Sequence, residues 1–283
     1  MCDILKAEFK LQNFGFPCSK PEALYTCQWK WHRAIYWTIR VIMAAYALGA
    51  VITSYVMSVG DKHIILVYLT IWTFTLLTIH LWIATVITIF YRPTMDKSGE
   101  KMHGVTNPDF LPSSVESTIS QTADTSRSNI EDIRCIPWFL KLSWLLGNVV
   151  LAFEIVVTII YFVFLFPDEK NRGVLINNMN MHAMNTVFVL VDFCISARPV
   201  YLLHVIYPII YGTIYAVFSV IYWTQDHVNN VLYSVLDWNS PGYAIGLVVI
   251  LAIVILPLFQ LIFFGLHRLK LKIYYHLYKT TYF

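Results

Sequence analysis

The sequence predicts an all-α fold: an integral membrane bundle of six transmembrane helices with both termini in the cytosol. Three observations predict it, namely the composition, six long apolar stretches and an uneven distribution of basic residues. Hydrophobic residues make up 58% of the 283 residues and charged residues only 13%, and the mean hydropathy is +0.60. Soluble domains carry about 25% charged residues, so this chain has too few charges to cover a surface that faces water. The composition excludes an ordinary soluble enzyme, and a net charge of +3 gives no reason to expect nucleic acid as a partner.

Six stretches are long and apolar enough to span a membrane, which takes about 20 residues for about 30 Å of hydrocarbon. They divide the chain into an N-terminal segment 1–33, a membrane domain 34–266 and a basic tail 267–283. A loop at 91–137, rich in Ser, Thr, Asp and Glu, interrupts the membrane domain, and its composition predicts a flexible cytosolic linker. The predicted spans are 34–57, 64–90, 138–166, 176–197, 202–223 and 243–266.

Basic residues lie almost entirely on one predicted side of the membrane. With six spans, both termini, the loop after the second span and the turn after the fourth share a side. Only three of the 20 Lys and Arg residues, namely Lys62, Lys170 and Arg172, fall on the other side. Because loops rich in Lys and Arg stay in the cytosol, this asymmetry predicts cytosolic termini and also supports the count of six spans.

The fourth predicted span carries a stripe of polar residues. Asn178, His182, Asn185, Asp192 and Ser196 fall within roughly 80° of one another on a helix of 3.6 residues per turn. Such a stripe must face protein or water, because polar groups are costly in lipid. The stripe predicts either a functional cavity or hydrogen bonds that hold helices together, and the combination of a histidine with a carboxylate favours the cavity.

Two pairs of residues on the second and fourth predicted spans lie at matching depths. Thr70 and His182 are each six residues into their spans, and His80 and Asp192 are each sixteen residues in. If the two helices are neighbours, each pair can meet. A hydroxyl beside an imidazole is the minimum for nucleophilic acyl transfer. Glu154, near the middle of the third span, is a further buried carboxylate, and a metal site built from His80, His182, Glu154 and Asp192 is a rival interpretation without supporting ligand spacing.

Two segments resemble the rolling stone family of multispan membrane proteins. They are YLTIWTFTLL from Tyr68 and NTVFVLVDFCISARPVYLLHVIYPIIYGTIYAVFSVIYW from Asn185. A Tyr-Leu-Thr at the second span recurs in that family. So do an acidic residue, Ser and Pro at the end of the fourth span, followed by His, Tyr-Pro, Gly-x-x-Tyr and Phe. The resemblance covers roughly 64–266 without the long loop, and it implies a link to muscle cell fusion.

More distantly, the chain is similar to the androgen-induced family of membrane threonine hydrolases, which cleave fatty acid esters of hydroxy fatty acids. Their nucleophile follows an apolar dipeptide in Phe-Leu-Thr, and Thr70 takes that place here in Tyr-Leu-Thr. Their catalytic histidine precedes an acidic residue by ten positions, as His182 precedes Asp192. The two residues after that histidine are Ala-Met in this chain and Thr-Thr in those hydrolases.

The residues and the resemblance together predict an intramembrane hydrolase of lipid esters. Thr70 would be the nucleophile and His182 the general base, while Asn178 or Asn185 would polarise the ester oxygen or orient the imidazole. Asp192 lies about 15 Å along the helix from His182, so we expect it to contribute to the cavity and to pair with His80. No cofactor is required.

A non-enzymatic membrane scaffold or cell-fusion factor with a lipid-binding polar cavity is the alternative. In either case membrane lipids are the expected partners, and the plasma membrane or the endoplasmic reticulum is the expected location. Sequence leaves the protein partners unknown.

Overall fold

The computed structural model describes residues 8–17, 20–57, 65–91, 136–166 and 172–282, and it describes the side chains of the fourth long helix from Met181 onward. Most of the predicted flexible loop at 91–137 therefore lies outside the described residues.

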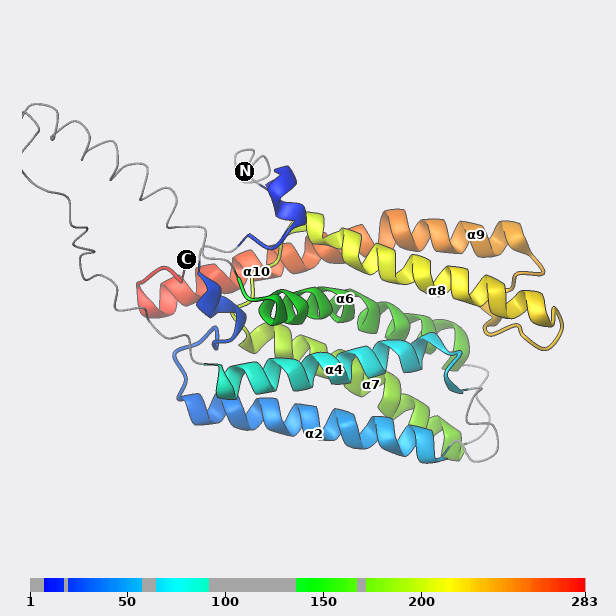
Figure 1. The fold of residues 1–283 in the computed structure, drawn as a ribbon, viewed down its shortest axis with the longest axis horizontal. Helices are drawn as coiled ribbons and strands as arrows, with labels where there is room; N and C mark the ends of the chain where they lie inside the picture. Colours follow the sequence, from blue (N-terminus) through cyan, green and yellow to red (C-terminus); the bar gives the residue numbers. More distant parts are fainter. Residues whose placement is uncertain (1–7, 18–19, 58–64, 92–135, 167–171, 283) are drawn as a thin grey trace, which may run out of the picture.

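Long helices make up nearly all of the described chain, and no strand occurs in it beyond an isolated antiparallel bridge between Cys27 and Ser196. Helices α2, α4, α6 and α7 pack on one another, while α8 and the continuous run from α9 to α10 lie along one side of α6 (Figure 1). Short helical turns named η join or extend them. The elements are η1 (Leu11–Phe14), η2 (Pro21–Leu24), α2 (Arg33–Met57), α4 (Leu69–Phe90), α6 (Trp138–Ile160), η3 (Tyr161–Leu165), α7 (Arg172–Ile195), η5 (Leu202–Val205), α8 (Ile206–Gln225), η6 (Ser234–Leu236), α9 (Pro241–Ile250), η7 (Leu251–Ile255) and α10 (Leu256–Tyr278).

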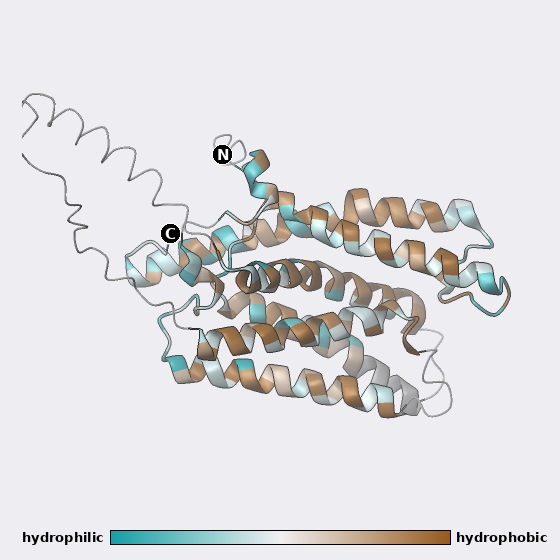
Figure 2. Ribbon diagram, in the orientation of Figure 1, coloured by the Kyte–Doolittle hydropathy of each residue, from teal (hydrophilic) through white to brown (hydrophobic). Residues whose placement is uncertain are grey.

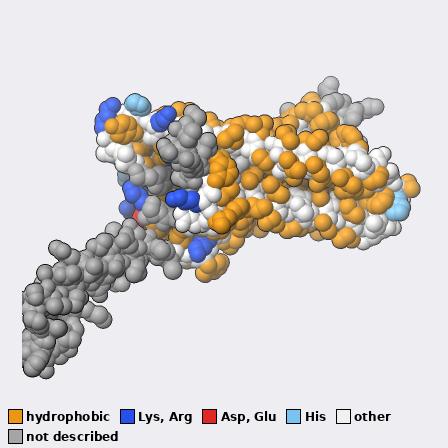
Figure 3. All heavy atoms as spheres, turned by 90° about the horizontal axis from the view of Figure 1, so that it is seen from above, with side chains coloured by type: hydrophobic (Ala, Val, Ile, Leu, Met, Phe, Trp, Pro, Cys, Tyr) orange, Lys and Arg blue, Asp and Glu red, His pale blue; other side chains and the backbone are white. Residues whose placement is uncertain are grey.

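The described helices have the length and polarity of membrane spans. Five stretches qualify by length and hydropathy, and the described part of α7, Met181–Ile195, is a shorter apolar helix. Apolar residues cover the helices along their length, while polar residues concentrate toward their ends (Figure 2). On the face seen in Figure 3, Lys and Arg gather at one end of a long hydrophobic body. The architecture is that of a multipass membrane bundle.

Two helices begin at positions that differ from the predicted spans. The second predicted span begins at 64, but α4 begins at Leu69, after an extended Tyr68. The fourth predicted span begins at 176, but α7 begins at Arg172. Thr70 therefore lies one residue into its helix and not six, while His182 lies ten residues into α7 and not six. Hydropathy misplaced both ends because it measures apolar content and not the backbone conformation at a helix end.

The last helix continues to Tyr278, twelve residues beyond the predicted end of the sixth span at 266. The sequence from 267 alternates basic and apolar residues, which prolongs the helix beyond the purely apolar stretch; it ends at Lys279, whose φ is 53°. Pro257 lacks a backbone donor and crowds the carbonyl four residues earlier. The turn just before it, η7, is a π-helix, and such a widened turn relieves this conflict.

The N-terminal segment folds back over the end of the bundle where α10 ends (Figure 1). The backbone N–H of Gln28 donates to the carbonyl of Ile195 at 2.7 Å, and the hydroxyls of Thr26 and Tyr282 lie 2.8 Å apart. Lys270 of α10 donates to the carbonyl of Phe193 at 2.6 Å, near the end of α7. Carbonyls at a helix C-terminus lack partners within the helix, so these contacts close this end of the bundle.

Candidate functional site

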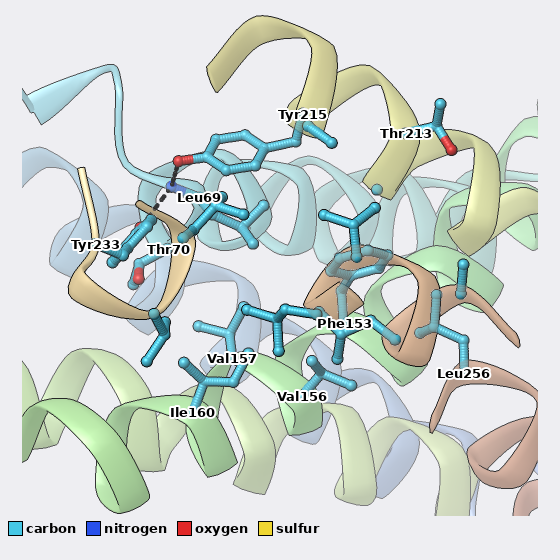
Figure 4. Close-up of a pocket in the computed structure, with 18 of the residues that line it drawn as sticks. Leu69, Thr70, Phe153, Val156, Val157, Ile160, Thr213, Tyr215, Tyr233 and Leu256 are labelled. Atoms are coloured by element: carbon cyan, nitrogen blue, oxygen red, sulfur yellow. Dashed lines mark hydrogen bonds between the residues drawn. The ribbon is translucent and has the colours of Figure 1, made fainter. Parts of the chain in front are cut away.

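An apolar pocket lies between α4, α6, α8 and the α9–η7 run. Thr70 and His182 both line it, although no hydrogen bond between them is among those of the described residues. The cavity volume is about 100 Å³, and the empty space is about 890 Å³ when the open mouth is included. Most of its wall is aliphatic or aromatic, with side chains from α6, α8 and η7 (Figure 4).

Thr70 stands at the start of α4, where two tyrosines gather (Figure 4). The backbone N–H of Leu69 points at the hydroxyl of Tyr215 at 3.1 Å and at that of Tyr233 at 2.9 Å. Tyr215 in turn donates to the carbonyl of Val67 at 2.9 Å. The first N–H groups of a helix have no partner within it, so the two hydroxyls take the place of a cap. Tyr233 also lies beside the Thr70 side chain.

Tyr233 comes from the loop between α8 and η6, and burial raises the pKa of its hydroxyl. The hydroxyl therefore keeps its proton at neutral pH. Tyr215 and Tyr233 were not among the candidate residues of the sequence analysis. Tyr215 is the tyrosine of the Gly-x-x-Tyr motif in the family resemblance, but the motif assigns it no role. No local pattern marks Tyr233, which reaches Thr70 only through the path of α8 and the loop that follows it.

His182 is buried at 6% exposure and lies flat against Tyr161, with ring centres 3.8 Å apart and planes 8° apart. Its backbone carbonyl accepts a hydrogen bond from the Thr158 hydroxyl at 2.7 Å. Its Nδ1 has no hydrogen-bond partner among the described residues. The ring is thus held in place by stacking, and its Nδ1 is buried without a polar partner among the described residues.

The other described residues of the predicted stripe, Asn185, Asp192 and Ser196, pack inside the bundle and do not line the pocket. Asn185 donates to Glu154 Oε2 at 3.0 Å, and both residues are fully buried. The Thr73 hydroxyl lies beside the same carboxyl and donates to the carbonyl of Thr70 at 3.1 Å. The sequence left the partner of Glu154 open, and the structure shows that it is Asn185. Together with Thr73 these groups form a first polar layer, on the side of the bundle where α4 begins.

A second, ionic layer lies about two helical turns deeper, since seven residues separate Asn185 from Asp192. Asp192 pairs with Arg40 at 2.5 Å and with Arg198 at 2.7 Å. His80 Nε2 lies 3.3 Å from Asp192 Oδ2, so the expected contact between these two side chains is present. All four residues are buried.

The two arginines were missing from the candidate site. Arg40 and Arg198 counted only as cytosolic charges in the sequence analysis, yet both lie in the interior. The available signal was the position of Arg40 inside the first predicted span, because an arginine in a span needs a partner. Gly147 provides the room for Arg198: a Cβ at this position would lie 2.5 Å from the guanidinium carbon.

The side chain of Asn178, predicted to help orient the imidazole or the ester, lies outside the described residues. The rival metal set is not gathered in one place: Glu154 contacts Asn185, while His80 contacts Asp192. Within the described part of the chain, no group of three or more His, Cys, Asp or Glu side chains could hold a metal ion.

Long apolar helices with ionic groups paired in their interior define a multipass membrane protein. The chain belongs to the rolling stone family, since the family model described as protein rolling stone matches residues 1–102 and 112–282. Protein rolling stone of Drosophila melanogaster is 28% identical over 95% of this chain and 90% of its own length. No solved structure matches the chain significantly. The resemblance to the rolling stone family is thereby confirmed.

Proposed function

We propose that the protein is an intramembrane hydrolase of lipid esters, with Thr70 as nucleophile and His182 as general base. What supports the proposal is that both side chains line one apolar pocket, although they come from different helices. Fatty acid esters of hydroxy fatty acids are a candidate substrate class, from the distant similarity to the membrane threonine hydrolases.

In the proposed reaction, the Thr70 oxygen attacks the ester carbonyl carbon while the imidazole of His182 takes the hydroxyl proton. The imidazolium gives this proton to the departing alcohol, which leaves a threonine ester of the fatty acid. Water then attacks the carbonyl carbon of this ester while the same imidazole takes a proton from it; the bond to the Thr70 oxygen breaks, the imidazolium returns the proton to that oxygen, and the acid is released. The attack requires Thr70 and His182 to approach on substrate binding or to connect through one water molecule, and such contacts are often long in empty sites.

The start of α4 is suited to the negative oxygen that forms during the attack. Helix N-termini carry a partial positive charge, although the N–H groups of Leu69 and Ile71 already bond to the two tyrosine hydroxyls and to the carbonyl of Tyr68. The Tyr233 hydroxyl accepts from Leu69, so its own proton could be donated to a carbonyl oxygen held beside Thr70. Donors of this kind contribute the largest single share of catalysis in many hydrolases.

The test uses the full-length protein in detergent and a fluorophosphonate probe that labels activated hydroxyls. Thr70→Val and His182→Ala should abolish labelling, and Thr70→Ser should keep part of it. Loss of the general base should also slow ester hydrolysis by about 10²–10⁴-fold. Thr213→Val is the matched control: Thr213 lines the same pocket, but its hydroxyl donates to the carbonyl of Ile209 at 2.8 Å. Unchanged labelling of Thr70→Val would refute the proposal.

A non-enzymatic scaffold or fusion factor is the second candidate. The observation that favours it is the interior location of Glu154, Asn185 and Asp192, which bond to other side chains and not to the pocket. If a stable Thr70→Val, His182→Ala double variant fully restores the biological role of the protein, catalysis is not its function.

We also propose that the end of the bundle where α2 begins and α10 ends faces the cytosol, in the plasma membrane or the endoplasmic reticulum. Of the 20 Lys and Arg residues, all but three belong to this side if the chain crosses six times. A C-terminal tag should then resist protease added to the outer or lumenal side, and its digestion there would reverse the orientation.

A further inference from the structure

The pocket beside Thr70 has a polar end and an apolar end (Figure 4). Thr70 and Tyr233 lie at one end, and Phe153 and Leu256 lie at the other. Between them Val156, Val157 and Ile160 of α6 form one apolar wall. This is the polarity of a lipid with a single polar group at the end of a chain.

The length of the pocket can be taken from the helices that form its walls. Seven residues separate Ile160 from Phe153, which corresponds to about 10 Å along α6. Nine residues separate Leu247 from Leu256, or about 13 Å in an α-helical rise. A pocket of this length and of mostly aliphatic lining matches one extended alkyl chain.

The pocket is also placed so that a chain can enter from the membrane. Close backbone contacts of α9 with α6 or with α8 are sparse among the described residues, so this side of the bundle is packed more loosely than the α2–α4–α6–α7 side. The side chains of Val249 and Ile253, on α9 and η7, are exposed on the outer surface. A lipid tail could therefore pass between helices without crossing water.

The closed end depends on a contact between Phe153 and Gly212. A Cβ at position 212 would lie only 2.8 Å from Cζ of Phe153, closer than side chains pack. The Phe153 ring also meets Tyr211 edge to face, with ring centres 4.9 Å apart. Phe153 is 5% exposed, so the ring has little room elsewhere. Glycine at 212 thus permits the ring position that closes the pocket.

We propose that this pocket binds a single alkyl chain of a lipid, with the polar group beside Thr70 and Tyr233 and the terminal methyl group against Phe153, and that the Phe153–Gly212 contact determines the chain length. This inference rests on the site of the proposed function but concerns binding, so it holds whether or not an ester is hydrolysed there.

The experiment uses full-length protein in nanodiscs and saturated fatty acids of increasing length, each with a photoreactive diazirine at the terminal carbon. Crosslinks in the wild-type protein should map to Phe153, Gly212 or Leu256 and should peak at one chain length. Phe153→Ala should shift the peak to longer chains and raise their crosslinking several-fold. Gly212→Ala, which pushes the ring into the pocket, should shift it to shorter chains. Gly49→Ala, on α2 outside the pocket, should leave the peak in place.

Phe153→Leu provides a milder variant if Phe153→Ala does not yield a monodisperse protein, and it should shift the peak in the same direction. Crosslinks that map outside the pocket, or a peak that no Phe153 or Gly212 variant moves, would overturn the inference. Thr70→Val separates the two proposals. It should abolish fluorophosphonate labelling but retain terminal crosslinks, so failure of catalysis leaves the binding proposal intact and failure of crosslinking leaves catalysis intact.

Discussion

Asp192→Asn should destabilise the protein severely, because it removes the one carboxylate that neutralises two buried arginines. Asp192 is 3% exposed, and its oxygens lie 2.5 Å from Arg40 and 2.7 Å from Arg198. Removing one partner of a buried ion pair costs about 3–5 kcal/mol, since the other charge stays buried without compensation. Two cations would be left here, so we expect at least the upper part of that range.

Thermal unfolding in detergent, followed by size-exclusion chromatography after heating, measures this loss. At about 2–4 °C per kcal/mol for a chain of this size class, the midpoint should fall by roughly 10 °C or more. Arg40→Met should cost less, since Asp192 keeps Arg198. Replacing the three residues together, as Arg40→Met, Asp192→Leu and Arg198→Met, should recover much of the loss because none of the three charges of this cluster remains buried. A midpoint within about 2 °C of wild type for Asp192→Asn would refute this account of the ionic layer.

Two further predictions concern the interior. Gly147→Ala should lower the unfolding midpoint by an amount similar to Arg198→Met, because the new Cβ would occupy the place of the Arg198 guanidinium. Gly49→Ala is the control: a Cβ there meets nothing within 4 Å, so the midpoint should stay the same or rise slightly. Asn185→Leu should cost about 1–3 kcal/mol, measured by the same thermal assay, because Glu154 loses its hydrogen bond in the interior; no change would mean that the carboxyl finds another partner.

The sequence singled out Thr70 and His182, which line one pocket, but not the arrangement of the helices that brings them there. Thr70 and His182 were paired by counting residues from predicted helix starts, and both starts were wrong, at 64 and 176. The two side chains line one pocket all the same. One helix starts later than predicted and the other starts earlier, so the two residues no longer lie at equal distances from their helix starts. They share a pocket because of how α4 and α7 are positioned relative to each other, and counting residues along single helices cannot give that position.

The buried charged residues also show what residue positions along the chain can and cannot predict. Asp192 and His80 could be paired from the sequence because each lies far inside an apolar stretch, where a polar group requires a partner. Arg40 and Arg198 were assigned to the cytosolic surface, because a count of basic residues does not distinguish an arginine that faces headgroups from one that turns inward. The room that Gly147 leaves for Arg198 exists only between α6 and the segment after α7.

By itself, the sequence determined that this is a multipass membrane protein and which residues are too polar to face lipid. Both properties are local: the free energy of transferring a segment into a membrane is close to a sum over its own residues. The tertiary structure alone decided which polar groups meet, which tyrosines gather at Thr70 and where a lipid-sized pocket remains. These depend on side-chain packing between helices that are distant in sequence, and no local pattern encodes that packing.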